Sequence, residues 1–167
     1  MINDTSALRD DPEMAKVAAR AGVPVCLMHR RGTPADMQRG RGPVYADVIA
    51  EILAFLKERV ELAAEAGIAR ERIVIDPGIG FGKRTEDNLV IMKNINRFVE
   101  AGHPVLIGAS RKRFIGEVLG VDDPCDRKAG SLTCAVLAAQ AGAAIVRVHD
   151  VRATLEAIRL HKAIVDG

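Results

Sequence analysis

Polar side chains end five short apolar stretches of this 167-residue sequence. The clearest stretch is residues 73–75, three β-branched residues followed by Asp76 and then by a proline and three glycines within residues 77–82. The β-branched run predicts a strand buried on both faces, and the proline and glycines predict a loop. A carboxylate at a rigid strand end, beside a loop that lets a ligand approach its backbone, is how many α/β enzymes build a site.

The other four apolar stretches also end in groups that bind or react. Their ends are Asn3-Asp4, Met28-His29, Ser110-Arg111-Lys112 and Arg147-Val148-His149. If these ends meet, they offer a hydrogen-bonding set in which Asn donates and accepts, ionised Asp accepts and Lys donates. The residues of that set are Asn3, Asp76 and Lys112. It suits the edge of a heterocycle that carries adjacent NH, NH₂ and C=O groups.

A second set is cationic and suits a phosphate or a diphosphate. Arg147 and His149 lead it, and Arg111 and Lys83 are further candidates. Arg147 interrupts a strand that is otherwise apolar, and a buried charge is costly unless it is paired, so we expect an anionic partner. Residues 78–83 do not have the spacing of a P-loop, so we do not predict a nucleotide-phosphate loop there.

The elements that position these groups follow a repeating order. An Ala-Gly pair ends a helical pattern and precedes an apolar strand at residues 21–22, 66–67, 101–102 and 141–142. Helices are expected over 11–21, 44–66, 85–99 and 114–119, with two more after 126 and after 150. Glycine stops helices because it adopts the left-handed conformation readily. The pattern predicts a parallel sheet built from five βα units.

Two α/β architectures fit five such units. One is a doubly wound sheet of flavodoxin type, in which sites gather at the switch point. The other is roughly the last five units of a TIM (β/α)₈ barrel, a fold that usually needs at least about 200 residues. All five strand ends carry polar groups, and all strand ends of a barrel converge on one mouth. We therefore favour one partial barrel domain over residues 1–167, truncated at its N-terminus.

Composition excludes several classes of partner. Aromatic residues make up 3% of the sequence and the net charge is +2, so neither base stacking nor general polyanion binding is expected. We predict no nucleic-acid partner and no membrane span, because the most apolar segment, residues 134–148, is too short. The three cysteines have no CxxC spacing, which favours a reducing cytoplasm and a role as small core residues.

Five motifs together resemble those of the bacterial dihydropteroate synthase family. They lie at residues 2–4, 28–34, 76–83, 108–116 and 147–151, and the resemblance covers the whole chain in the family's order. It implies a (β/α)₈ barrel of folate biosynthesis. The implied reaction joins 6-hydroxymethyl-7,8-dihydropterin diphosphate to 4-aminobenzoate, with loss of diphosphate. A pterin-dependent methyltransferase and a non-catalytic pterin-binding or assembly module remain alternatives.

The resemblance also implies a role for each matching residue. The pterin would be bound by Asn3, Met28, Asp76, Gly108, Lys112 and Arg147; the diphosphate by Arg147 and His149; and 4-aminobenzoate by Phe81, Lys112 and Arg113. Lys112, Arg147 and His149 would carry the catalysis. Arg113, and the pair Arg30 and Arg31, stand where many relatives have other residues.

The same resemblance implies parts that the sequence lacks. The family's first three strands and two mobile loops are missing, and with them the residue that contacts Mg²⁺, so no metal ligand is assigned here. We expect the chain alone to be inactive, because a site without three of its walls admits water. The resemblance implies a homodimer for the full-length protein.

Overall fold

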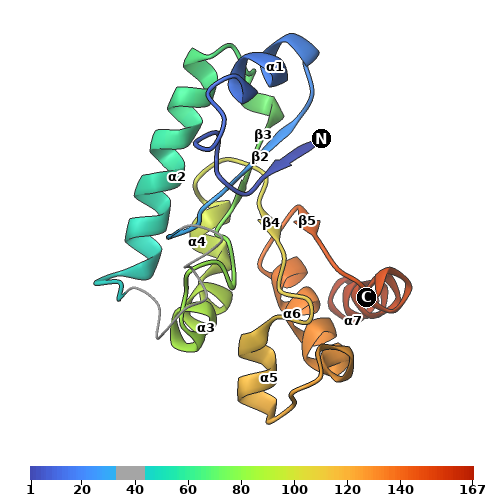
Figure 1. Cartoon of the computed structure of the whole chain (residues 1–167). Helices are drawn as coiled ribbons and strands as arrows, with labels where there is room; N and C mark the ends of the chain where they lie inside the picture. The colour runs from blue at the N-terminus through green and yellow to red at the C-terminus, as the bar shows by residue number, and fades with distance from the viewer. Residues whose placement is uncertain (33–43) are drawn as a thin grey trace.

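The structure, a computed structural model, describes residues 1–32 and 44–167. Residues 33 and 34 of the 28–34 motif lie outside the described part. The described strands are β1 (Ile2–Asp4), β2 (Val25–Met28), β3 (Ile73–Asp76), β4 (Leu106–Ile107) and β5 (Ile145–Val146). They are parallel and can be followed in Figure 1. The prediction of an α/β fold with parallel strands is confirmed.

The described strands lie side by side in the order in which they occur along the chain. β1, β2 and β3 form one hydrogen-bonded sheet, and β4 pairs with β5. The amide of Ile75 donates to the carbonyl of Pro104 at 2.9 Å, and Ile75 bridges to Val105, so the two groups of strands meet. A doubly wound sheet reverses its strand order at the switch point. These strands do not reverse, which rules out the flavodoxin-type alternative for the described part.

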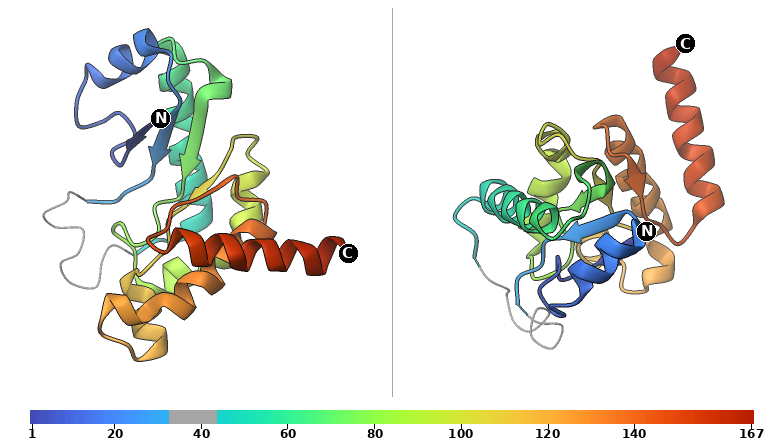
Figure 2. Two further views of the ribbon diagram at one scale, coloured as in Figure 1. Left: turned by 90° about the vertical axis from the view of Figure 1, so that its right-hand side faces the viewer. Right: turned by 90° about the horizontal axis from the view of Figure 1, so that it is seen from above.

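Helices follow every strand. They are α1 (Met14–Ala21), α2 (Val48–Glu65), α3 (Thr85–Lys93), α4 (Ile95–Val99), α5 (Arg113–Leu119), α6 (Lys128–Gln140) and α7 (Val151–Asp166), with 3₁₀ turns at Arg70–Arg72 and Pro124–Arg127. Figure 2 shows α7 extending away from the strands, beside α6. Among the described residues, no helix is both long and apolar enough to cross a bilayer.

Three helix boundaries differ from the sequence prediction. The first helix begins at Met14 because the Asp11 carboxylate accepts from the amide of Glu13 and so closes a turn before the helix. The second begins at Val48 because the Asp47 side chain caps it, accepting from the amides of Ile49 and Ala50. The helix expected over 85–99 is divided at Asn94 into α3 and α4.

The glycine stops are confirmed. Gly22, Gly67, Gly102 and Gly142 all have a positive φ, between 59° and 95°. The prediction that all three cysteines are core residues is wrong for one of them. Cys26 and Cys134 are buried, but Cys125 is exposed because it lies in the 3₁₀ turn that precedes α6.

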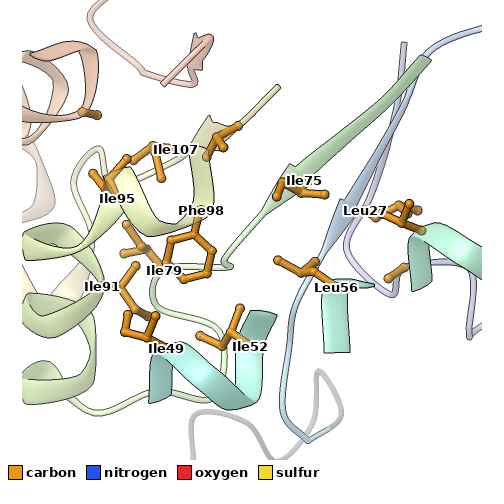
Figure 3. Close-up of a cluster of buried hydrophobic side chains, with 14 of the residues drawn as sticks. Leu27, Ile49, Ile52, Leu56, Ile75, Ile79, Ile91, Ile95, Phe98 and Ile107 are labelled. Atoms are coloured by element: carbon orange, nitrogen blue, oxygen red, sulfur yellow. The ribbon is translucent and has the colours of Figure 1, made fainter. Parts of the chain in front are cut away.

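The two faces of the strands have different partners. Alternate strand positions such as Leu27, Ile75 and Ile107 pack against the helices, where they meet Leu56 of α2 and Phe98 of α4 (Figure 3). The positions between them form a second, smaller cluster on the opposite face. Its members are Cys26, Val74, Leu106 and Ile145. Side chains alternate between faces along a strand, so this second face also carries the residues two positions further on.

Candidate functional site

Strand register places the candidate residues on the face opposite the helices. Met28 pairs with Asp76 across β2 and β3. Gly108 and Arg147 each follow by two residues a member of the small inner cluster, and a Cβ added to Gly108 would lie 3.2 Å from Arg147 Nη2. Met28 and Asp76 therefore share one level at the carboxyl ends of the strands. Gly108 and Arg147 share the next level, because the bridge between Ile75 and Val105 places Asp76 in register with Leu106. Asn3, which pairs with Cys26, is exposed on the same face one level deeper than Met28 and Asp76.

A hollow of about 570 Å³ opens beside Gly108 and Arg147. Its lining residues are Phe81, Gly108, Ser110, Arg111, Lys112, Pro124, Arg147, Val148 and His149. The Lys112 ammonium lies over the Phe81 ring, 4.1 Å from its centroid. Burial lowers the pKa of Lys112, and the nearby positive charge of Arg147 adds to that effect. The hollow is within the size range of small-molecule sites. The charged residues of its lining are the cations Arg111, Lys112 and Arg147, and the lining carries no carboxylate.

Asp76 is the buried acid of the site. Its side chain is 3% exposed, and its Oδ1 accepts from the amide of Gly78 at 2.7 Å. Burial raises the pKa of Asp76 to about 6, while the Gly78 amide and the charges of Lys83, Arg147 and Lys112 act in the opposite direction. Within the described residues, no hydrogen-bond donor reaches the second carboxylate oxygen. That oxygen can accept from a ligand.

Arg147 differs from the expectation of a buried charge. β5 ends at Val146, and the Arg147 side chain is exposed. It forms no ion pair with any of the residues that the structure describes. The premise that burial forces an anionic partner was therefore wrong. Water solvates the guanidinium in the absence of a ligand, and an anion in the hollow can replace that water.

His149 is held by the neighbouring strand end. Its Nδ1 lies 2.9 Å from the hydroxyl of Ser110, and its backbone amide donates to the same oxygen at 3.3 Å. The sequence marked Ser110 as part of a polar strand end but assigned it no role. Pro124, which closes one side of the hollow, carried no signal in the sequence at all. The pair of Ser110 and His149 joins the ends of β4 and β5.

Two members of the predicted cationic set are engaged in the protein itself. The Arg111 guanidinium makes a two-pronged contact with the Asp150 carboxylate at 3.1 Å, so it ties α7 to the end of β4. Lys83 is 6% exposed, and its ammonium donates to the carbonyls of Gly78 and Phe81 at 2.9 and 3.2 Å. Both side chains were predicted as phosphate ligands, but each already donates its hydrogen bonds to protein acceptors.

His29 and its two following arginines support the site from outside. His29 is buried, with its ring edge-on to Phe55 at 4.9 Å, and burial together with the Lys83 charge lowers its pKa to about 2. The ring is thus neutral. Arg30 pairs with Asp10, and Arg31 pairs with Glu51. The two arginines contact protein groups outside the hollow.

Arg113 lies beside the hollow and does not line it. Arg113 is exposed and pairs with Glu117, and it lines a smaller cavity of about 120 Å³ together with Gly80 and Lys112. Over residues 1–32 and 44–167, no three His, Cys, Asp or Glu side chains come together in a group that could hold a metal ion.

Comparison with known proteins gives a consistent result. A family model described as "Pterin binding enzyme" matches residues 1–149. The dihydropteroate synthase of Escherichia coli K12 is 44% identical over 163 residues, which is 98% of this chain and 56% of that protein. The relative from Neisseria meningitidis serogroup C, also named dihydropteroate synthase, is 42% identical over 98% of this chain and 58% of its own length. The chain thus spans little more than half the length of these curated relatives.

Solved structures agree with these relatives. The Stenotrophomonas maltophilia dihydropteroate synthase, with imidazole bound in its active site, has a TM-score of 0.93 and 46% identity, covering 98% of this chain and 61% of its own. The Xanthomonas albilineans enzyme in complex with 7,8-dihydropteroate has a TM-score of 0.89 and 48% identity, covering 98% and 58%. The same enzyme has been solved with 4-aminobenzoic acid, at 47% identity and a TM-score of 0.89, covering 98% and 57%.

Proposed function

The chain belongs to the pterin-binding enzyme family, and we propose that it serves the dihydropteroate synthase reaction. In that reaction 6-hydroxymethyl-7,8-dihydropterin diphosphate and 4-aminobenzoate give 7,8-dihydropteroate and diphosphate. The observation that carries the proposal is that Met28, Asp76, Gly108 and Arg147 share one face of the strand ends, on two successive levels, beside the hollow lined by Lys112 and His149. The relatives that cover most of the chain are named for the same activity.

The pterin edge would be recognised at the end of β3. Asp76 is buried, and its second oxygen can accept from the ring NH and the amino group of the pterin, in a place where water competes little. Lys112 would donate to the pterin oxo group from across the hollow. Asn3 faces the same side and would bond the same edge. Met28, in register with Asp76, would pack against the ring, and Gly108 leaves room for it.

The diphosphate would lie against the exposed side chains of Arg147 and His149. The bond between the pterin methylene carbon and the diphosphate oxygen breaks with both electrons passing to the oxygen. Arg147 and His149 would stabilise the negative charge that develops there. The amine nitrogen of 4-aminobenzoate then forms the new bond to the methylene carbon and releases a proton. Phe81 and the stem of Lys112, which lie against each other, would form one wall of the aminobenzoate slot. Arg113, in the neighbouring cavity, is a further candidate for the aminobenzoate carboxylate.

Further parts of the proposal concern the whole protein. The five described βα units would be the last five of an eight-unit barrel. We propose Mg²⁺ only for the full-length protein, because no group of three His, Cys, Asp or Glu side chains that could hold it is found among the described residues. The exposed apolar side chains Leu155, Leu160 and Ile164 of α7 support a homodimer. The three cysteines of the chain are free thiols, which supports a cytoplasmic location.

A pterin-binding module without turnover is the second candidate for these 167 residues taken alone. It is favoured by the 56% share of the Escherichia coli relative that the chain spans. A methyltransferase is less well supported, because methyl transfer releases no diphosphate and would leave the exposed side chains of Arg147 and His149 without a role.

Separate titrations test the proposal. Calorimetry on the purified chain should show binding of the pterin diphosphate, no binding of 4-aminobenzoate and no formation of dihydropteroate. An Asp76→Asn variant should lose the pterin, whereas Glu156→Gln, on the outer surface of α7, should keep it. Absence of pterin binding by the unmutated chain would refute the proposed site. Turnover at the rate of a full-length relative would refute the expectation of inactivity.

A further inference from the structure

Lys83 is a buried lysine for which the proposed reaction has no use. Besides the carbonyls of Gly78 and Phe81, its ammonium donates to the carbonyl of His29 at 3.3 Å and lies 3.0 Å from His29 Nδ1. Its contacts therefore join two segments that are 54 positions apart in the sequence. The loop after β3 curls around the ammonium, and the end of β2 closes the remaining side.

A buried lysine at position 83 is not expected to stabilise the fold. Among the described residues, Lys83 forms no salt bridge, and burial lowers its pKa despite the charges of Asp76 and Asp87 nearby. A buried ammonium held only by neutral acceptors costs free energy relative to an apolar side chain. The carbonyls that it contacts belong to the loop and the strand end that surround the Asp76 carboxylate.

The loop also lies directly on the segment that leaves β2. A Cβ added at Gly78 would come within 1.8 Å of the His29 carbonyl oxygen, and one added at Gly82 within 2.0 Å of that of Arg31. Both glycines have a positive φ. Backbone therefore touches backbone at each end of the loop, and the Lys83 ammonium adds a further contact between the same two segments at the His29 carbonyl. Asp76 lies two residues before the first of these contacts, and Phe81 lies one residue before the second.

We propose that Lys83 is a positioning residue whose ammonium pins the loop of residues 77–82 onto the end of β2 and so fixes the Asp76 carboxylate and the Phe81 ring at the site. The idea that this placement serves pterin binding rests on the proposed function. The pinning itself does not, because it is a contact within the chain. A neutral side chain at this position would release the loop and would remove a positive charge from the surroundings of Asp76.

The expected effect on Asp76 follows from the groups that face it. They are Lys83 on the loop, Lys112 after β4, Arg147 after β5 and the thiol of Cys26 on β2. Lys83 is the largest of the charges that oppose the rise in the pKa of Asp76. Its removal should therefore raise the pKa of Asp76 further, so that ionisation is lost at a higher pH than in the unmutated chain.

Carboxyl NMR on the full chain tests this inference without any substrate. In Lys83→Met the titration midpoint of the Asp76 carboxyl carbon should rise by about one pH unit. Amide exchange at Gly78 and Gly80 should become at least about tenfold faster, since the loop opens locally. Lys93→Met, which removes an exposed lysine of α3, should change neither. An unchanged midpoint together with unchanged exchange in Lys83→Met would overturn the inference.

A second measurement decides the matter if Lys83→Met does not fold. In the unmutated chain, the Lys83 ammonium should show through-bond couplings to the carbonyl carbons of Gly78 and Phe81. Rapid solvent exchange of the ammonium without such couplings would overturn the inference. The two proposals can fail separately: a shifted Asp76 titration in a chain that binds no pterin supports the pinning and refutes the proposed function, whereas pterin binding without the shift refutes only the pinning.

Discussion

The ends of β3 and β5 present opposite charges in opposite ways. At the end of β3, Asp76 is buried, one of its oxygens is taken up by Gly78, and the following loop is held by Lys83. At the end of β5, Arg147 is exposed and unpaired among the described residues, and it faces Gly108, the residue that follows the neighbouring strand β4.

The difference teaches which groups need a prepared environment. A carboxylate that must distinguish one heterocycle from another gains strength and direction from burial, at a cost in stability. Under the proposed function, the diphosphate would instead meet the exposed side chain of Arg147, where an anion can replace the surrounding water. The site therefore combines a rigid end and an adaptable end.

The largest effect should come from a methyl group added at Gly78, and Gly108 offers the matched comparison beside Arg147. Gly78→Ala puts a Cβ into the His29 carbonyl at a position with φ of 71°, and should destabilise the fold by about 3 kcal/mol or more. Gly108→Ala meets only the flexible end of Arg147, at 3.2 Å, and should cost about 1 kcal/mol or less. Urea unfolding of both variants measures the contrast. Equal losses would mean that the β5 end is as rigid as the β3 end.

Asp76→Asn should separate binding from stability. The folded-state pKa of Asp76 is raised to about 6, so its contribution to stability is present below about pH 4 and is lost as pH rises through 6. Above pH 6 the neutral amide should therefore make the fold more stable, by about 3 kcal/mol. Pterin affinity should fall about a hundredfold, because two charge-assisted hydrogen bonds are lost.

Unfolding curves at pH 4 and pH 7.5 measure the stability of the Asp76 variant, and calorimetry measures its affinity. Asp87→Asn is the matched control. The hydrogen bonds and charge of Arg84 hold the pKa of Asp87 below its usual value against burial, so that substitution should destabilise the fold at neutral pH. A less stable Asp76→Asn at pH 7.5 would contradict the view that burial of Asp76 is costly.

Arg147→Gln should give the smallest effect. Affinity for the pterin diphosphate should fall about tenfold, because one exposed charge-assisted contact is lost. Stability should stay within about 0.5 kcal/mol, since the side chain has no partner to lose among the described residues. Affinity measured between 0.05 and 0.3 M salt, about the range over which screening becomes strong, should vary less in the variant than in the unmutated chain. An unchanged salt dependence would place the diphosphate elsewhere.

Much of the fold could be predicted from local patterns. The apolar runs that end at Asp76 and Met28 predicted β3 and β2, and the Ala-Gly pairs predicted where helices stop. Strand ends and glycine stops depend on neighbours within a few residues. The helix start at Met14 was missed because a turn at Asp11 competes locally with the helix. The break at Asn94 interrupts an apolar pattern that continues through it.

The engagement of the charged residues could not be predicted. Arg111 and Asp150 are 39 positions apart, and Lys83 and His29 are 54 apart. Their pairing depends on which strands become neighbours and on side-chain directions, and the local sequence pattern predicts neither. The exposure of Arg147 was likewise misjudged, because its apolar neighbours predicted a strand that continues through it, whereas β5 ends at Val146.

The sequence by itself determined the order of strands and helices and the chemical groups that stand at the strand ends, because both follow from short-range periodicity and residue type. Only the tertiary structure decided which of those groups are free to meet a ligand. That choice depends on burial and on partners brought together from distant parts of the chain, as at Lys83 and Arg111, which the fold engages, and at Arg147, which it leaves open.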